Sequence, residues 1–175
     1  MKLPKLNDTK PKLVCRILLL LMIVSTVGFA YVNSIMPPAV SEQQSGTVGE
    51  IISQIIPPTT PLGSFVQQYL RKIAHFTEYG LLGAELAIYV IFFTENKKKW
   101  VPVSILFAFF VGFIDETIQV FSNRGPSVMD VWLDFAGCLT YSALTYAVAA
   151  VIYLVLSRIR RRTAERKEME KSQNG

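Results

Sequence analysis

The sequence predicts an all-α, polytopic membrane protein with about four transmembrane helices. Three observations predict this class. About half of the chain is hydrophobic (51%), its apolar residues come in long blocks with little charge, and Lys and Arg cluster beside those blocks. A helix needs about 20 apolar residues to cross the hydrocarbon core of a bilayer, and each block is about that long. The net charge of +5 therefore indicates basic membrane flanks. It does not indicate a nucleic-acid partner, because no aromatic platform interleaves with the basic residues.

The first apolar block covers residues 14–32 and follows a basic N-terminal segment, residues 1–13. A basic start before an apolar run is also the pattern of a secretory signal peptide. This run is longer than the usual apolar region of such a peptide, and no clear small-x-small cleavage site follows it. We therefore expect a retained first helix.

An outer loop is predicted for residues 33–72, which are rich in Pro, Ser, Thr, Gly and Gln. Its prolines argue against a continuous helix, although residues 50–56 have the pattern of two amphipathic turns on the membrane surface. Those prolines are Pro37, Pro38, Pro57, Pro58 and Pro61. The remaining spans are predicted at residues 73–93, 100–121 and 131–156, and a basic tail covers residues 157–175. The spans and their loops form a single membrane domain over residues 14–156.

The positions of the basic residues predict the orientation. Residues 1–13, 95–99 and 157–175 carry most of the Lys and Arg, and such segments favour the cytoplasmic side. Both termini are therefore expected to be cytoplasmic. The loops at 33–72 and 122–130 are then expected to face outward.

Ionisable residues inside the predicted spans point to a site. A charge at the centre of a membrane helix costs at least about 2.5–3.5 kcal/mol, so such residues are functional by default. Those near the outer end are His75, Glu78 and Tyr79 on the second span, Asp115, Glu116 and Gln119 on the third, Arg124 in the next turn, and Asp130 and Asp134 on the fourth. Carboxylates outnumber cations there. Some are thus expected to be protonated, to share a proton or to bind a cation.

Structural roles remain alternatives for several of these residues. Asp130 has the position of a helix cap, Arg124 that of a turn residue paired with a carboxylate, and Gln119 that of an interhelical hydrogen bond. Glu85, about 15 Å deeper than His75, is suited to facing a neighbouring helix in its neutral form. Whether Asp115 or Glu116 points into the bundle is left open. The small residue Gly137 permits close helix contact, and Cys15 and Cys138 have no metal-ligand spacing.

Two groups of these residues resemble the paired signatures of the VanZ-like family. The first is Lys72-x-x-His75-Phe76-x-x-Tyr79-x-x-Leu82-Gly83, and the second is Asp115-Glu116-x-x-Gln119 with Arg124, followed by Ser127-x-x-Asp130-Val131-x-x-Asp134-x-x-Gly137. The family's usual Gly-Arg turn appears as Asn123-Arg124-Gly125, and its frequent Gly-x-x-Gly ending as Gly137-x-x-Thr140. The resemblance implies a multi-pass protein of the bacterial plasma membrane, in a family linked to resistance against the glycopeptide teicoplanin.

The first functional hypothesis is an enzyme that acts on a lipid-linked envelope molecule at the outer leaflet. In this hypothesis, Asp115 or Glu116 is the general base or a metal ligand, His75 the acid–base partner, and Arg124 a clamp for an anionic group. Glu78 and Asp130 complete the catalytic set, and Tyr79, Gln119 and Asp134 contact the substrate. One His with carboxylates suits Mg²⁺ or Mn²⁺ better than copper.

Two further hypotheses need no reaction. One is a binding or resistance module that holds a lipid head group or the antibiotic, and the other, ranked last, is a small transporter or flippase. Only Glu85 lies deep in the membrane and the sequence shows no evident inverted repeat, which disfavours transport. The sequence leaves open whether the protein is an enzyme, its cofactor, its ligand and its oligomeric state.

Overall fold

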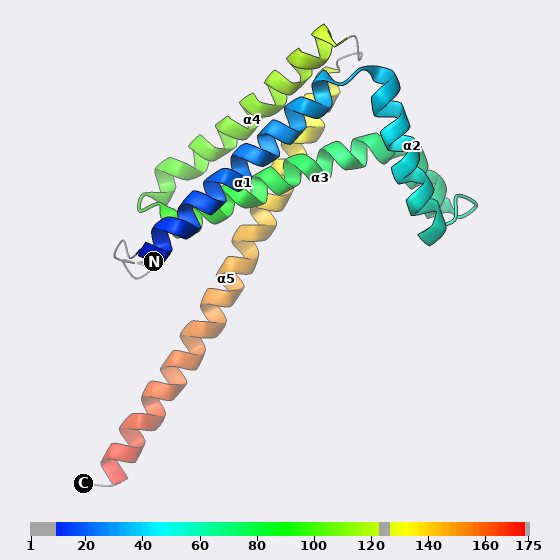
Figure 1. The fold of residues 1–175 in the computed structure, drawn as a ribbon. Coiled ribbons are helices and arrows are strands. Elements are labelled where there is room, and N and C mark those ends of the chain that lie inside the picture. The colour runs from blue at the N-terminus through cyan, green and yellow to red at the C-terminus, as the bar shows by residue number, and fades with distance from the viewer. Residues whose placement is uncertain (1–9, 123–126, 174–175) are drawn as a thin grey trace.

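Five α-helices make up nearly all of the part of the chain that the structure, a computed structural model, describes: residues 10–122 and 127–173 (Figure 1). They are α1 (Lys10–Ile35), α2 (Pro38–Ile55), α3 (Pro61–Phe93), α4 (Lys97–Phe121) and α5 (Val128–Gln173). Four of them, α1, α3, α4 and α5, are long and apolar enough to cross a membrane. The predicted class, an all-α protein with about four transmembrane helices, is confirmed.

The four long helices alternate in direction. Near its start, α1 contacts the later part of α3, where Arg16 Nε donates a hydrogen bond to the Tyr89 hydroxyl at 3.1 Å. Near its end, α1 contacts the later part of α4, where Ser34 Oγ donates to Asp115 Oδ1 at 2.6 Å. One end of the bundle, called the site end below, therefore carries the ends of α1 and α4 and the start of α5.

Glycines allow α3 and α5 to approach closely. A Cβ atom added at Gly83 would meet the backbone of Cys138, and one added at Gly137 would meet the backbone of Phe76. Ser142 Oγ also donates to the Gly83 carbonyl at 2.9 Å across this contact. Small residues let helix backbones approach in membranes, so the close contact predicted at Gly137 is confirmed.

The segment between the first two spans is more helical than the sequence predicts. Helix α2 covers Pro38–Ile55, well beyond the two turns expected. The prolines lie at helix ends, where their missing N–H costs nothing. Pro38 is in the first turn of α2 and Pro61 is the first residue of α3, whose N-cap Thr60 accepts a hydrogen bond from Gly63 N at 3.0 Å.

Helix α3 begins at Pro61, earlier than its predicted start at residue 73, so its first turns extend beyond the bundle. Helix α2 packs beside them, and Gln67 Nε2 donates to the Gly49 carbonyl at 2.7 Å. In Figure 1, α2 and the first part of α3 form an arm beside the site end of the bundle. We call this pair of segments the α2–α3 arm.

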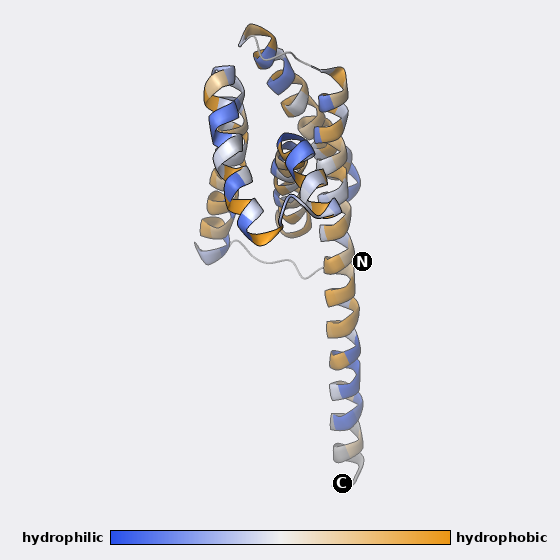
Figure 2. Cartoon of the chain, turned by 90° about the vertical axis from the view of Figure 1, so that its right-hand side faces the viewer, coloured by the Kyte–Doolittle hydropathy of each residue, from blue (hydrophilic) through white to orange (hydrophobic). Residues whose placement is uncertain are grey.

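Helix α5 extends past the other end of the bundle (Figure 1). Large apolar side chains such as Leu144 (60% exposed) and Val151 (59% exposed) cover its middle, and Figure 2 shows this apolar stretch giving way to hydrophilic residues toward the C-terminus. Apolar exposure on this scale fits contact with lipid, because a soluble protein rarely exposes so large a patch. The basic tail predicted at residues 157–175 continues α5 as a helix to Gln173.

Candidate functional site

Polar side chains from four helices meet at the site end of the bundle. Asp115 and Asp134 are 0% exposed, Gln119 is 1% exposed and Glu116 is 6% exposed. Burying such groups is unfavourable unless hydrogen bonds or opposite charges satisfy them. The contacts of each buried group therefore indicate whether it has a structural partner within the protein.

Asp115 joins α4 to α1. Its Oδ1 atom accepts a hydrogen bond from Ser34 Oγ at 2.6 Å, and its Oδ2 atom accepts one from Gln119 Nε2 at 3.1 Å. The short distance from Ser34 fits an O–H donor to a carboxylate. These two bonds hold the Asp115 carboxylate in a defined orientation.

Gln119 and Glu116 connect α4 to α3 and to the start of α5. Gln119 Nε2 lies 3.2 Å from Glu116 Oε1, and Gln119 Oε1 accepts a hydrogen bond from Arg71 Nη2 at 3.2 Å. Glu116 Oε2 accepts a hydrogen bond from the Ser127 backbone N–H at 3.0 Å. Gln119 therefore forms an interhelical hydrogen bond, one of its two predicted roles. Asp115 and Glu116 both point inward, which resolves the question the sequence left open.

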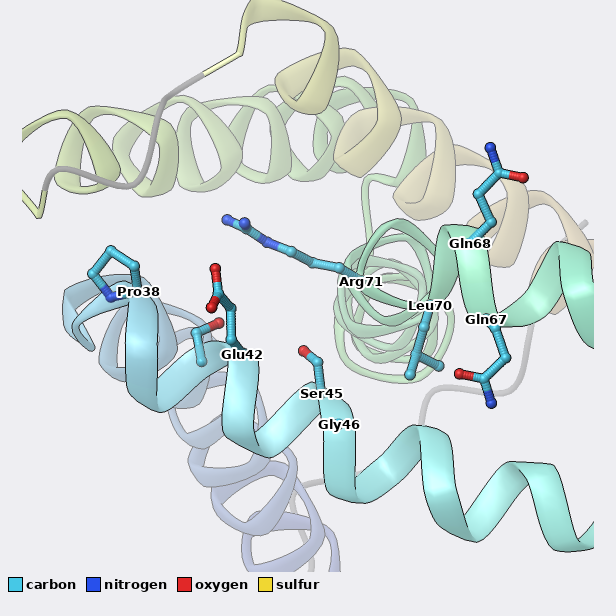
Figure 3. A pocket seen from close by; sticks show the side chains of 9 residues that line it. Pro38, Glu42, Ser45, Gly46, Gln67, Gln68, Leu70 and Arg71 are labelled. Carbon is cyan, nitrogen blue, oxygen red and sulfur yellow. The ribbon is translucent and has the colours of Figure 1, made fainter. Parts of the chain in front are cut away.

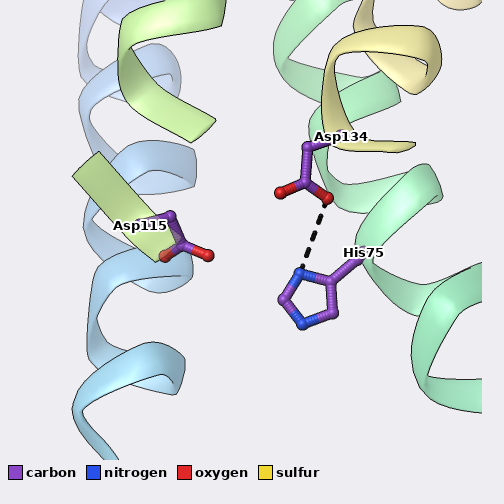
Figure 4. Close-up of side chains that lie close together, drawn as sticks. All are labelled: His75, Asp115 and Asp134. Atoms are coloured by element: carbon purple, nitrogen blue, oxygen red, sulfur yellow. Dashed lines mark ion pairs between the residues drawn. The ribbon is translucent and has the colours of Figure 1, made fainter. Parts of the chain in front are cut away.

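His75 and Asp134 approach each other from α3 and α5 (Figure 4). His75 Nδ1 lies 3.7 Å from Asp134 Oδ1. Neither carboxylate oxygen of Asp134 accepts a hydrogen bond within the part of the chain that the structure describes. His75, Asp115 and Asp134 each offer one ligand atom, and these atoms all lie within 4.8 Å of one another. We call these three residues the His–Asp–Asp cluster.

Glu78 and Tyr79 lie one turn further along α3. Tyr79 is 1% exposed and its ring packs near Gly112 and Asp134. Glu78, Tyr79 and Thr26 are among the residues around a small internal space between α1, α3 and α4. His75, Glu78 and Tyr79, at i, i+3 and i+4, therefore share a face of α3 that turns toward the bundle interior.

Asp130 lies at the partly exposed rim of the site. Its Oδ1 atom is 3.9 Å from Lys72 Nζ, and the two side chains are 30% and 58% exposed. Asp130 is in the first turn of α5, where a negative charge is favourable. Although Asp130 and Asp134 are one helical turn apart, only Asp134 reaches the cluster.

Glu85 makes a separate polar contact deeper in the bundle. It is 3% exposed, and its Oε1 atom accepts a hydrogen bond from Thr26 Oγ1 on α1 at 3.0 Å. Glu85 thus faces a neighbouring helix, which was the structural alternative for this residue.

An open groove of about 410 Å³ lies between α2 and α3, beside the site end (Figure 3). Its lining includes Glu42 from α2 and Arg71 from α3, whose side chains project into the space between the two helices. Since Arg71 also binds Gln119, one side chain links the groove to the buried polar groups. The volume is in the range of small-molecule sites.

Two residues that contact the predicted set, Ser34 and Arg71, are not among the residues predicted from the sequence. Ser34 lies just after the first apolar block and carries no charge, so its local sequence does not distinguish it from other loop residues. Arg71 falls within the predicted outer loop, residues 33–72, but it lies four residues before His75 and so shares its helix face. Arg124, the predicted clamp, lies outside the described residues.

Comparison with known proteins gives one family. A family model described as VanZ/LLP1 matches residues 17–157. The matched segment contains Ser34, Arg71 and the whole His–Asp–Asp cluster. No curated protein and no solved structure matches the chain.

Proposed function

The chain belongs to the VanZ/LLP1 family, and from this premise we propose that it binds or acts on the head group of a lipid-linked molecule of the bacterial cell envelope. Through that activity it contributes to resistance against glycopeptides such as teicoplanin. The observation that carries the proposal is the buried His–Asp–Asp cluster beside the groove between α2 and α3.

The proposal places this site at the outer leaflet of the plasma membrane. Lys97, Lys98 and Lys99 begin α4, at the end of the bundle opposite the cluster. The arginines from Arg158 to Arg162 lie about 45 Å along α5 from its start at the site end. Clustered basic residues favour the cytoplasm, so the opposite end faces outward.

The groove suits an amphipathic ligand. Arg71 offers a guanidinium group, which pairs well with phosphate or carboxylate. Ser41, Ser45 and Gln68 supply further polar lining on both helices. A head group bound here leaves its lipid chain beside the apolar outer surfaces of the bundle, where Leu21 and Phe113 are more than half exposed.

In the enzymatic form of this proposal, the cluster supplies acid–base groups. His75 offers an imidazole that faces Asp134 across 3.7 Å, and Asp115 is held in place by Ser34 and Gln119. Glu116, bound to Ser127, positions Gln119 and the start of α5. Glu78, Tyr79 and Asp130 surround these groups, and Arg124 is a second candidate clamp.

Non-catalytic binding is the second candidate function. One observation favours it: the carboxylate oxygens of Asp115 and Glu116 already accept hydrogen bonds within the protein. Such bonds hold a binding surface rigid without requiring a reaction.

The test is teicoplanin susceptibility of a Gram-positive host that expresses the protein, with vancomycin as the control drug. We expect wild-type protein to protect, and His75→Ala, Asp134→Asn and Arg71→Ala to lose protection at matched membrane levels. Glu85→Gln is the matched control, since it removes a buried carboxylate outside the site.

Full protection by all three site variants would contradict the assignment of the site. Protection that survives the carboxylate-to-amide change, scales with expression and is lost only in Arg71→Ala would select binding over catalysis.

A further inference from the structure

We propose that His75, Asp115 and Asp134 form a binding site for one divalent cation, of the kind that accepts an imidazole nitrogen together with carboxylate oxygens, such as Mn²⁺ or Zn²⁺. The three ligands come from α3, α4 and α5, so the ion would hold three transmembrane helices together. This inference does not depend on the proposed function, because a bound cation serves catalysis, ligand binding or stability alike.

The distances fit ligands of a shared ion better than a direct hydrogen bond. His75 Nδ1 and Asp134 Oδ1 are 3.7 Å apart, which is longer than a hydrogen bond. Ligand atoms at about 2.0–2.2 Å from one ion lie about 3–4.3 Å from each other. The three ligand atoms of the cluster all lie within 4.8 Å, so small side-chain rotations bring them to one ion.

Asp134 supplies the second, independent observation. Its side chain is 0% exposed, and both of its oxygens lack a hydrogen-bond donor among the described residues. Figure 4 shows this carboxylate directed at the His75 ring, with Asp115 on the other side of the space. A fully buried carboxylate is strongly unfavourable in its ionised form unless it is paired or coordinates a metal.

The surroundings of Asp115 resemble the outer shell of a metal site. Ser34 and Gln119 each donate to one of its oxygens, and Gln119 is itself held by Arg71. Each carboxylate oxygen has a second lone pair, so both hydrogen bonds are compatible with coordination. Outer-shell bonds of this type orient metal ligands.

The charges also call for a cation. Asp115 and Asp134 together carry up to two negative charges in a buried space, and a divalent ion neutralises both. The basic residues nearby have other partners in the described structure: Arg71 binds Gln119, and Lys72 pairs with Asp130.

The donor set indicates the kind of ion. One imidazole with two carboxylates is a mixed nitrogen–oxygen ligand set. This set suits Mn²⁺ or Zn²⁺ better than it suits Mg²⁺ or Ca²⁺, which prefer ligands that are all oxygen. Three protein ligands also leave a coordination position for water or for an anionic group of a ligand.

The experiment uses the full chain with a histidine-free affinity tag, purified in a neutral detergent and stripped with a chelator. Bound Mn²⁺ is counted by electron paramagnetic resonance, and pulsed measurements detect coupling to a nitrogen ligand. Because the sequence contains a single histidine, an imidazole coupling identifies His75 without any substitution. We expect one saturable Mn²⁺ per chain with this coupling, displaced by Zn²⁺ more readily than by Mg²⁺.

Variants then test the carboxylates. Asp115→Asn and Asp134→Asn are expected to weaken Mn²⁺ binding by at least about tenfold, and Ser34→Ala by about tenfold through the outer shell. Glu85 is a buried carboxylate on α3 outside the cluster, so Glu85→Gln should bind Mn²⁺ as tightly as wild type does. The inference is overturned if wild type shows no saturable Mn²⁺ or Zn²⁺, if bound Mn²⁺ lacks imidazole coupling, or if Asp134→Asn and Glu85→Gln bind equally well.

Discussion

At the scale of the residue, burial gives similar side chains different roles. Asp130 is a rim carboxylate in an exposed pair with Lys72, and pairs of this kind contribute little to stability. Asp134, one turn further along α5, is fully buried and directed at His75. The two residues share a helix face, so their difference comes from depth in the bundle.

Glu85 and Thr26 provide a test at this scale. Thr26→Val removes the hydroxyl that donates to Glu85 Oε1 across α1 and α3. We expect the free energy of unfolding to fall by about 0.6 kcal/mol, and by no more than about 1.7 kcal/mol, the range of interhelical hydrogen bonds in membranes. Reversible unfolding in mixed detergent micelles measures this change.

Thr77→Val is the control for that substitution. The Thr77 hydroxyl donates to the Ile73 carbonyl within α3 at 2.8 Å and makes no hydrogen bond to another helix among the described residues, so a smaller loss is expected. A double-mutant cycle with Glu85→Gln should show coupling for Thr26 and none for Thr77. Equal losses for both threonine variants would argue against the interhelical bond.

At the scale of the element, the contact of α3 with α5 positions the site. Gly83 and Gly137 let the two backbones meet, and this contact sets the distance between His75 on α3 and Asp134 on α5. The short loops around Pro37 and Pro57 act differently: they turn the chain so that α2 lies beside α3 and forms one wall of the groove.

Gly137→Ala tests that packing. The added methyl group would meet the Phe76 backbone, which is unable to rotate away as a flexible side chain would. We therefore expect the free energy of unfolding to fall by about 1–3 kcal/mol, as in other overpacked cores. Micelle unfolding measures this loss. Retention of wild-type stability would mean that α3 and α5 are further apart at Gly137 and Phe76 than in this structure.

Gly28→Ala is the matched control, because nothing lies within 4 Å of a Cβ atom added at Gly28 on α1. Its stability should be unchanged or slightly higher, since alanine favours the helix by about 1 kcal/mol over glycine in water.

At the scale of the whole molecule, alternating helices separate two chemically distinct ends. The site end carries the buried carboxylates, and the opposite end carries the lysines that begin α4. Such a distribution predicts one orientation in the membrane, with the site outside and both termini in the cytoplasm.

Single-cysteine labelling tests the orientation. Cys15 is first replaced by serine and Cys138 by alanine. A single cysteine is then introduced at Gly46 on α2 or at Lys98 at the start of α4, and both positions are exposed. A membrane-impermeant maleimide should label Gly46→Cys in intact cells, and Lys98→Cys only after the membrane is opened. The reverse pattern would place the site in the cytoplasm and contradict an outer-leaflet substrate.

Much of this architecture is determined by the sequence itself. The lengths of the apolar blocks determine the membrane class and the number of long helices, because a bilayer admits only segments that satisfy their own backbone hydrogen bonds. Helical spacing also predicts that His75 and Tyr79 share a face, and that Asp115 and Asp134 lie near the same end.

Only the tertiary structure decides which of these polar groups meet. Side-chain depth and helix rotation depend on contacts between segments far apart in the chain, such as Gly137 with Phe76 and Ser34 with Asp115. Prolines indicate where a helix ends, but they do not indicate whether another helix begins. The full length of α2 is therefore seen only in the tertiary structure, where α2 packs on α3. The sequence by itself thus determined the solvent of this protein, a lipid bilayer, while long-range packing decided that Asp115 and Asp134 converge on one histidine.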